Sequence, residues 1–210
     1  MPQKPNQMKI LVNDAGKRFN RDWIFRNLHL SFSNNDTYAI TGHNGSGKST
    51  LLQCIAGSTY LSEGSIRFEM NGSIISDEQL FSCVSICAPY LEVIEEMTAV
   101  EFFSYHQQFK KLKDNLTIPN IIDQIGLSKH ANKQIRYYSS GMKQRIKLAQ
   151  AFFSDTPILL LDEPCTNLDQ QGIALYEELL SQHVKERILI ISSNDKTEYK
   201  GCTQVIQLGV

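Results

Sequence analysis

The chain has 210 residues and a formal net charge of -1 at pH 7. This near-neutral balance excludes the strongly basic surface by which proteins bind nucleic acid or an anionic membrane. Apolar residues make up 41% of the chain and charged residues 20%, which is typical of a globular protein with a hydrophobic core. No uninterrupted apolar stretch approaches the roughly 18 residues that cross a bilayer. We therefore expect a soluble, cytoplasmic protein that does not bind nucleic acid.

The first part of the chain alternates between apolar and polar residues in the manner of β-strands. This pattern covers residues 24–32, 37–41, 64–70 and 83–88. The middle of the chain is different, because Thr98 followed by Glu101 forms a capping box ahead of a helical pattern. Pro119 and Gly126 mark the first turn and the end of a second short helix. We expect a helical insertion at roughly 92–136.

After Tyr138 helices and strands alternate, and this order predicts an α/β core. The expected helices cover 141–153 and 172–184, and the expected strands cover 158–162 and 187–192. Both strands are nearly continuous aliphatic runs, typical of strands covered by helices on both faces. We expect one domain over 1–210, in which 1–91 and 137–210 form the core and 92–136 the helical subdomain.

The stretch "GHNGSGKST" follows the expected strand at 37–41 and leads into a helical pattern. It satisfies G-x-x-x-x-G-K-[ST], the pattern of a loop that binds nucleotide phosphates. Gly45 and Gly47 allow backbone shapes that point successive N–H groups at phosphate oxygens. Lys48 supplies a charge to the β- and γ-phosphates of ATP, and the Ser49 hydroxyl can bind Mg²⁺. The expected nucleotide contacts are Gly42, Asn44, Gly45, Ser46, Gly47, Lys48, Ser49 and Thr50.

A pair of acidic residues stands at the end of the buried strand "ILLLD". The carboxyl ends of strands line the ligand crevice of such sheets. Asp162 is therefore a candidate to hold Mg²⁺ through a water, and Glu163 to orient and deprotonate the attacking water. Acidic residues at a strand end can instead cap the next helix, but the phosphate-binding loop favours the catalytic interpretation.

The segment "YYSSGMKQR" at 137–145 resembles the signature motif of ATP-binding cassette (ABC) ATPases, LSGGQ followed by basic and glutamine residues. The motifs occur in the order of that family over essentially the whole chain. The resemblance implies a P-loop NTPase fold of the ABC ATPase type. Such a fold has an antiparallel β subdomain, a mainly parallel RecA-like core sheet and a helical insertion.

The same resemblance implies a head-to-tail dimer of two such subunits, with two ATP molecules buried between them. Ser139, Ser140, Gly141 and Met142 would then bind the γ-phosphate held by the other subunit. Asp169, in "TNLD", resembles the D-loop residue that crosses the dimer interface. An N-cap of the helix that starts at Gln170 is an equally plausible and compatible role for Asp169.

Two aromatic residues could stack on adenine as an aromatic residue of this family does, ahead of the phosphate-binding loop. Phe19 matches the position best, Trp23 is the alternative, and an aromatic residue without a ligand is a third reading. Tyr90 follows Pro89 where the family carries a glutamine that senses γ-phosphate and Mg²⁺. Its hydroxyl can donate to phosphate or water but is a poorer metal ligand than an amide, so Tyr90 and Glu92 both remain candidates.

The run "ILIISSND" ends in Ser193, Asn194 and Asp195, where the family usually has a small residue, histidine and aspartate. Asn194 follows Asp162 by one helix and one strand, so both are expected at the same edge of the sheet. Its amide can hydrogen-bond a γ-phosphate oxygen, but it cannot carry positive charge or relay a proton as imidazole does. We expect slow hydrolysis, or turnover that depends mainly on Glu163.

These observations favour the ATPase subunit of an ABC transporter, peripheral to the cytoplasmic membrane and bound there to a separate permease. The helical insertion and the loop at 90–98 are the expected contact surface. A nucleotide-gated dimerisation switch with little hydrolysis is one alternative. A soluble ABC protein acting on ribosomes or DNA is another, which the near-neutral charge disfavours.

Overall fold

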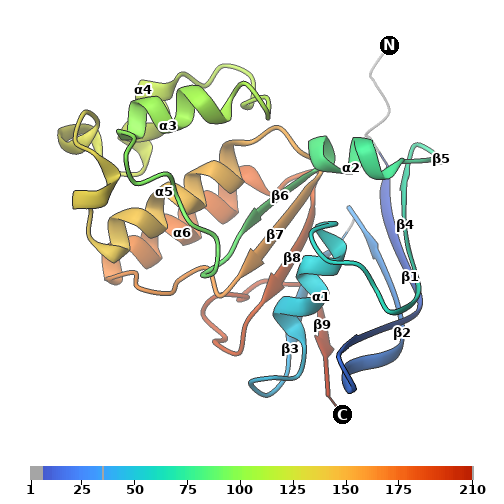
Figure 1. Ribbon diagram of the computed structural model, residues 1–210. Helices are drawn as coiled ribbons and strands as arrows, with labels where there is room; N and C mark the ends of the chain where they lie inside the picture. Colours follow the sequence, from blue (N-terminus) through green and yellow to red (C-terminus); the bar gives the residue numbers. More distant parts are fainter. Residues whose placement is uncertain (1–6, 35, 210) are drawn as a thin grey trace.

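Two β-sheets organise the chain (Figure 1). The structure is a computed structural model that describes residues 7–34 and 36–209. The antiparallel sheet has the order β2-β1-β4-β5 and the parallel sheet the order β6-β7-β8-β3-β9. An antiparallel subdomain beside a parallel core sheet confirms the expected fold class. Among the described residues, no helix combines the length and the apolar character that a membrane crossing requires.

The antiparallel sheet is built around a long strand that the sequence patterns did not predict. Its strands are β1 (Met8–Phe19), β2 (Asp22–Ser33), β4 (Glu63–Met70) and β5 (Ser73–Ile74). On β1 the alternate residues Met8, Ile10 and Val12 are buried. Ile10 lies opposite Phe32 of β2 and opposite Phe68 of β4. This apolar face covers the phosphate-binding side of the core.

The parallel sheet aligns the carboxyl ends of its central strands. Its strands are β3 (Thr37–Thr41), β6 (Val84–Cys87), β7 (Ile158–Asp162), β8 (Ile188–Ser192) and β9 (Gln204–Gln207). Asp162 of β7 pairs with Ser192 of β8, and Ser192 pairs with Ile40 of β3. The residues that follow these three strands therefore meet at one edge of the sheet.

Helices cover both faces of the parallel sheet (Figure 1). They are α1 (Lys48–Ile55), α2 (Asp77–Cys83), α3 (Ala99–His106), α4 (Ile118–Gln124), α5 (Ser140–Phe153) and α6 (Gln170–His183), with 3-10 turns at Ser128–His130 and Ile135–Tyr137. Leu159 and Leu161 of β7 belong to the core beneath α5 and α6, whereas Ile158 and Leu160 belong to the core that contains α1. Burial on both faces explains why the strand reads as a continuous aliphatic run.

The helical segment begins with the predicted capping box. The Thr98 hydroxyl accepts a hydrogen bond from the Glu101 N–H at 3.2 Å, and the Glu101 carboxylate accepts one from the Thr98 N–H at 2.8 Å. Gly126 follows α4 in the left-handed conformation, with φ 69°, as its predicted role at a helix end requires. Thr98 also forms a bridge with Gln134, which joins the two ends of the segment. The subdomain boundaries at 92 and 136 stay a prediction.

A buried histidine at the end of α3 is held in its neutral form. Its Nε2 lies 2.9 Å from the Ser154 Oγ, and its Nδ1 lies 3.4 Å from the Gln150 Nε2. Because the Ser154 hydroxyl donates to the Gln150 carbonyl at 2.6 Å, the His106 Nε2–H must donate to Ser154 and the Nδ1 must accept from Gln150. Burial, and to a smaller extent the nearby Lys110 charge, lower the pKa of His106 to about 4.

This histidine predicts a loss of stability in mild acid. In the unfolded chain histidine binds a proton at a pKa of about 6.5, so the unfolded state takes up the proton first. The free energy of unfolding should therefore fall as the pH drops from about 6.5 towards 4, by about 1.4 kcal/mol for each unit of pKa difference. Urea unfolding of His106→Gln should show a shallower loss over this window. The exposed His29→Gln is the control, and an unchanged slope in His106→Gln would contradict the prediction.

Candidate nucleotide-binding and catalytic site

The loop between β3 and α1 has the backbone shape that phosphate binding requires. Gly45 and Gly47 adopt φ values of 85° and 95°, which glycine reaches without steric cost. A Cβ atom at Gly47 would also lie 2.7 Å from the Ile24 side chain. The first N–H groups of α1 have no partner within the helix, and Gly47 provides no side-chain cap. These donors are free to face an anion.

The lysine of this loop is folded back over the loop itself. Lys48 is buried, and its Nζ donates to the Gly42 carbonyl at 2.8 Å and to the His43 carbonyl at 3.3 Å. The charge is thus held beside the helix N-terminus. The cavity at this position has a volume of about 300 Å³ and is lined by Ile24, Asn44, Gly45, Gly47, Lys48, Ser49, Thr50 and Glu163.

Several buried oxygen atoms in the phosphate-binding loop and at the adjoining sheet edge have no hydrogen-bond partner among the described residues. Asp162 is 1% exposed, and among the described residues its Oδ1 finds no donor; the Ser46 and Ser192 hydroxyls are also unpartnered. Buried polar atoms are normally hydrogen-bonded, because leaving them unpaired is costly. Carboxylate and hydroxyl oxygens are the ligands that Mg²⁺ prefers. The orphaned Asp162 carboxylate, with Ser49 on the facing loop, therefore fits a Mg²⁺ ion.

Glu163 points its exposed side chain at the same cavity. Its backbone has φ 43°, a conformation that residues other than glycine, asparagine and aspartate rarely adopt. Its N–H donates to the Ser192 carbonyl at 2.9 Å, which ties the residue to the end of β8. The next helix begins at Gln170 and is capped by Asp169. The structure therefore rules out the alternative that the acidic pair caps a helix.

Asn194 lies at the phosphate-binding loop, at the sheet edge where it was expected. Its side-chain oxygen accepts a hydrogen bond from the Gly42 N–H at 3.1 Å. Its Nδ2 donates to the Asn44 Oδ1 at 3.4 Å. The amide thus links the end of β8 to both the first turn and the tip of the loop.

Tyr90 is within electrostatic reach of the Asp162 carboxylate, whereas Glu92 lines a different cavity. Partial burial and the Asp162 carboxylate together raise the pKa of Tyr90 to about 12, against an opposing hydrogen bond with Gln53. The phenol therefore stays protonated at neutral pH and can act as a hydrogen-bond donor. Of the two candidates that the sequence left open, Tyr90 is the one placed near the orphaned carboxylate.

The signature residues form a second, separate site. The Ser139 hydroxyl caps α5 by accepting a hydrogen bond from the Met142 N–H at 3.2 Å. Asp169 caps α6 through the Gly172 N–H at 2.8 Å and pairs with Arg145 at 3.1 Å. These groups share a cavity of about 330 Å³ lined by Gly126, Leu127, His130, Ser139, Ser140, Gly141, Met142, Arg145, Asn167 and Asp169. It has no lining residue in common with the phosphate-loop cavity, and Figure 1 shows α5 and α1 starting well apart.

Neither aromatic candidate for adenine stacking lines the phosphate-loop cavity. Phe19 is 49% exposed, with the Lys17 Nζ 4.8 Å from its ring centroid. Trp23 is covered by the Arg26 guanidinium at 4.5 Å. From this part of the chain Ile24 lines the cavity instead. No sequence motif singled out Ile24, and only its contact with Gly47 in the structure reveals its position.

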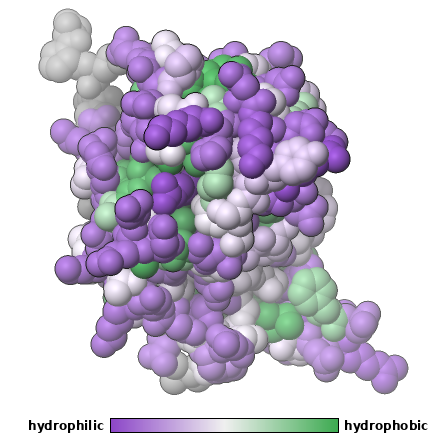
Figure 2. Space-filling view, turned by 90° about the vertical axis from the view of Figure 1, so that its left-hand side faces the viewer, coloured by the Kyte–Doolittle hydropathy of each residue, from purple (hydrophilic) through white to green (hydrophobic). Residues whose placement is uncertain are grey.

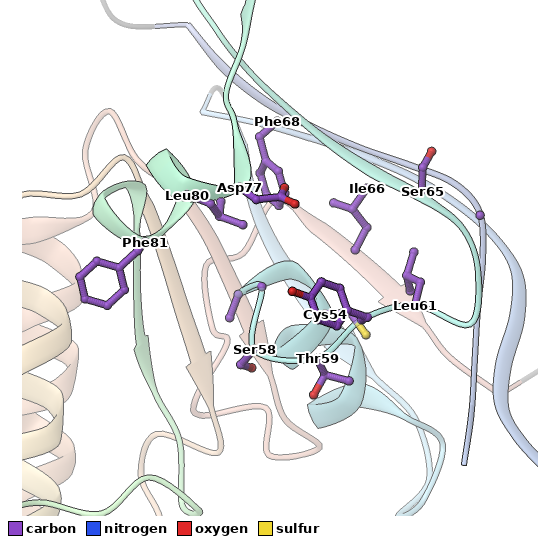
Figure 3. A pocket seen from close by; sticks show the side chains of 14 residues that line it. Cys54, Ser58, Thr59, Leu61, Ser65, Ile66, Phe68, Asp77, Leu80 and Phe81 are labelled. Atoms are coloured by element: carbon purple, nitrogen blue, oxygen red, sulfur yellow. The ribbon is translucent and has the colours of Figure 1, made fainter. Parts of the chain in front are cut away.

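A larger cavity of about 580 Å³ lies elsewhere and does not suit a nucleotide (Figure 3). It is formed by the end of α1, the loop that follows it, β4 and α2, with Cys54, Ser58 and Asp77 among its lining residues. Its lining contains a carboxylate and no Lys or Arg. The nearby lysines are engaged elsewhere: the Lys17 Nζ donates to the Tyr60 carbonyl at 2.7 Å, and the Lys110 Nζ lies 4.4 Å from the Phe81 ring centroid.

Comparisons with known proteins identify the family of the chain. Residues 25–166 match the family model described as ABC transporter. The chain belongs to the ABC transporter family. As a member of this family it binds ATP and is an ATPase, as the phosphate-binding loop and the Asp162–Glu163 pair predicted.

Relatives of this ABC protein are ATP-binding proteins of similar length. An uncharacterised ABC transporter ATP-binding protein, YybJ of Bacillus subtilis, is 29% identical over 90% of this chain and 87% of its own length. The cytochrome c biogenesis ATP-binding export protein CcmA of Aliivibrio fischeri is 31% identical over 80% of this chain and 82% of its own length. The post-hydrolysis dimer of the cassette MJ0796, bound to ADP and Pi, shares the fold with a TM-score of 0.80 at 20% identity, over 95% of this chain and 94% of that one.

The orphaned carboxylate predicts a metal-dependent change in stability. Asp162→Asn removes the buried charge, so without metal the variant should be at least as stable as the wild-type protein. Thermal unfolding with ADP alone and with ADP plus Mg²⁺ should show a Mg²⁺-dependent stabilisation in the wild-type protein only. Asp77→Asn, in the cavity of Figure 3, is the control and should keep the Mg²⁺ effect. A variant at Asp162 that keeps the full Mg²⁺ effect would contradict this assignment.

Proposed function

We propose that this chain hydrolyses ATP to power transport through a separate membrane permease, as one of two identical subunits arranged head to tail. The observation that carries the proposal is the separation of two half-sites within one chain. The phosphate loop and Glu163 line one cavity, and the signature residues line another. Two copies related by a two-fold axis would each complete the other's site, which makes ATP part of the dimer interface.

In this mechanism the phosphate loop binds ATP, and residues at the sheet edge carry out its hydrolysis. Lys48 and the free N–H groups at the start of α1 hold the β- and γ-phosphates. Ser49 and Asp162 would hold Mg²⁺, which neutralises charge on the phosphates. Glu163 orients the attacking water and takes its proton, and the Tyr90 hydroxyl donates a hydrogen bond at the same edge. The signature residues of the partner would bind the γ-phosphate from the opposite side.

A groove beside the helical segment supports the proposed contact with the permease. It has a volume of about 430 Å³ and lies between β6, α3 and α5, with Phe81, Leu91, Ile94, Tyr105 and Phe109 among its lining residues. All five of these side chains are exposed. The side of the molecule that carries the helical segment is mostly hydrophilic, with hydrophobic side chains gathered in patches (Figure 2). Exposed apolar clusters of this kind mark interaction surfaces, here for an apolar cytoplasmic helix of the permease.

The nucleotide-gated switch is the second candidate, and the contacts of Asn194 favour it. The amide already binds the loop through Gly42 and Asn44 and supplies no group that can move a proton. Hydrolysis in this chain then depends on Glu163 alone. The two candidates differ in whether the wild-type protein turns ATP over at a rate that Glu163 controls.

Replacement of the general base tests the proposed function. Glu163→Gln keeps the size of the side chain but cannot take a proton, so kcat should fall by about 100-fold or more. ATP binding should persist, and the variant should accumulate as an ATP-dependent dimer in size-exclusion chromatography with light scattering. Lys48→Ala should lose ATP binding and stay monomeric with ATP.

Two results would contradict the proposal in different ways. A negligible wild-type turnover that Glu163→Gln leaves unchanged would favour the switch. A protein that stays monomeric with ATP, while it still hydrolyses ATP, would refute the shared site between two copies.

The groove is tested by removing its aromatic rim. Tyr105 and Phe109 stack edge to face with centroids 4.9 Å apart, and both are exposed. The double variant Tyr105→Ser, Phe109→Ser should keep the ATPase activity of the isolated protein but lose co-purification with its permease from detergent-solubilised membranes. Tyr60→Ser, at an 85% exposed tyrosine outside the groove, is the matched control. Equal retention of the permease by both variants would contradict this contact surface.

A further inference from the structure

Two buried side chains form hydrogen bonds with a single peptide group in the backbone that follows Glu163. The Gln144 Nε2 of α5 donates to the Pro164 carbonyl at 2.7 Å. The Glu198 Oε1 accepts a hydrogen bond from the Cys165 N–H at 2.7 Å. The Pro164 carbonyl and the Cys165 N–H belong to the same planar peptide unit. Both of its polar atoms are therefore occupied by side chains from different parts of the chain.

The two side chains that bind this peptide are buried. Gln144 is 1% exposed and Glu198 is 5% exposed. Burial makes their hydrogen bonds costly to lose, because a buried donor or acceptor left without a partner bears its full desolvation penalty. Burial also raises the pKa of Glu198, and the Asp195 and Glu163 carboxylates raise it further against contacts with Ser193 and Cys165.

The gripped peptide lies between two residues with unusual backbone conformations. Glu163 has φ 43° and Asn167 has φ 64°. Such conformations persist only where the surrounding structure holds them. Glu198 is itself fixed from α6, since the Tyr176 hydroxyl donates to the Glu198 carbonyl at 2.6 Å. Through Tyr176, α6 thus fixes Glu198, which in turn hydrogen-bonds to the loop that leads into α6.

We propose that Glu198 and Gln144 are positioning residues that fix the 163–169 loop and so aim the Glu163 carboxylate at the attacking water. The proposal rests on the role of Glu163 in the proposed function. Glu198 follows Asn194 by four residues, and Gln144 follows the signature residues on α5. The two hydrogen bonds to this peptide therefore join the signature helix, the Glu163 loop and the segment that follows β8.

Two substitutions at Glu198 separate the hydrogen bond from general effects on the fold. Glu198→Ala removes the acceptor, so backbone hydrogen exchange in segment 163–168 should become about tenfold faster or more. Its kcat should fall by about tenfold or more, with KM for ATP within about twofold, because the phosphate loop is untouched. Glu198→Gln keeps an oxygen at the same place and should restore kcat to within about threefold of the wild-type value. Glu178→Ala, on the exposed face of α6, is the matched control and should change neither quantity.

A variant on the other side of the peptide keeps the test usable if Glu198→Ala does not fold. Gln144→Met preserves the side-chain volume but frees the Pro164 carbonyl, and it should show the same faster exchange and lower kcat. Unchanged exchange and kcat in both Glu198→Ala and Gln144→Met would overturn the proposal. So would a Glu198→Gln variant as impaired as Glu198→Ala, because charge rather than the hydrogen bond would then matter.

Hydrogen exchange distinguishes this proposal from the proposed function. If the wild-type protein showed no ATPase activity but exchange in 163–168 still rose in Glu198→Ala, the fixing of the loop by Glu198 would be supported and the proposed function would fail. If Glu163→Gln abolished turnover while Glu198→Ala and Gln144→Met left exchange and kcat intact, the proposed function would be supported and the positioning role of Glu198 and Gln144 would be refuted.

Discussion

The site depends on the parallel pairing of three neighbouring strands, β7, β8 and β3. Because Asp162 lies opposite Ser192 and Ser192 opposite Ile40, the chain leaves the sheet three times at the same level. It leaves as the Glu163 loop, as the segment containing Asn194 and as the phosphate-binding loop. Hydrogen bonds across the edge maintain this level, from the Glu163 N–H to Ser192 and from the Ser193 N–H to Ile40. A slip of one residue would move the Asp162 side chain to the other face of the sheet.

This edge concentrates polar atoms whose hydrogen-bonding capacity the described residues do not satisfy. The Asp162 Oδ1 and the Ser46 and Ser192 hydroxyls are buried without partners, in a protein whose sheet is otherwise packed on both faces by aliphatic side chains. Unsatisfied buried groups lower stability, and the backbone of Glu163 adds strain. In the proposed mechanism a bound nucleotide and Mg²⁺ would supply the missing partners. Ligand binding would then offset the cost of these unpaired groups and couple stability to ligand concentration.

Sequence patterns predicted the parts of the site that are local in the chain. The phosphate loop, the strand ending at Asp162, the Asp169 cap and the capping box at Thr98 each follow from residues a few positions apart. Patterns failed where a contact joins distant segments. Ile24 reaches the nucleotide cavity only because the antiparallel sheet packs over the loop. The hydrogen bond from the Cys165 N–H to the Glu198 carboxylate joins residues 33 positions apart. Neither residue type indicates in the sequence that it holds the loop.

The amide at position 194 is better understood from its contacts than from the histidine that the family usually has there. Its oxygen is occupied by the Gly42 N–H, so only the NH₂ group is free to move from Asn44 towards a phosphate. An amide has no basic nitrogen and keeps both of its N–H bonds at any physiological pH. In the proposed mechanism Asn194 therefore holds the loop and orients an anion, whereas the Glu163 carboxylate accepts the proton. Tyr90, protonated up to a pKa of about 12, is likewise a donor and not a base. In the proposed mechanism a single carboxylate, that of Glu163, acts as the base, so the geometry of the loop that carries it should set the rate.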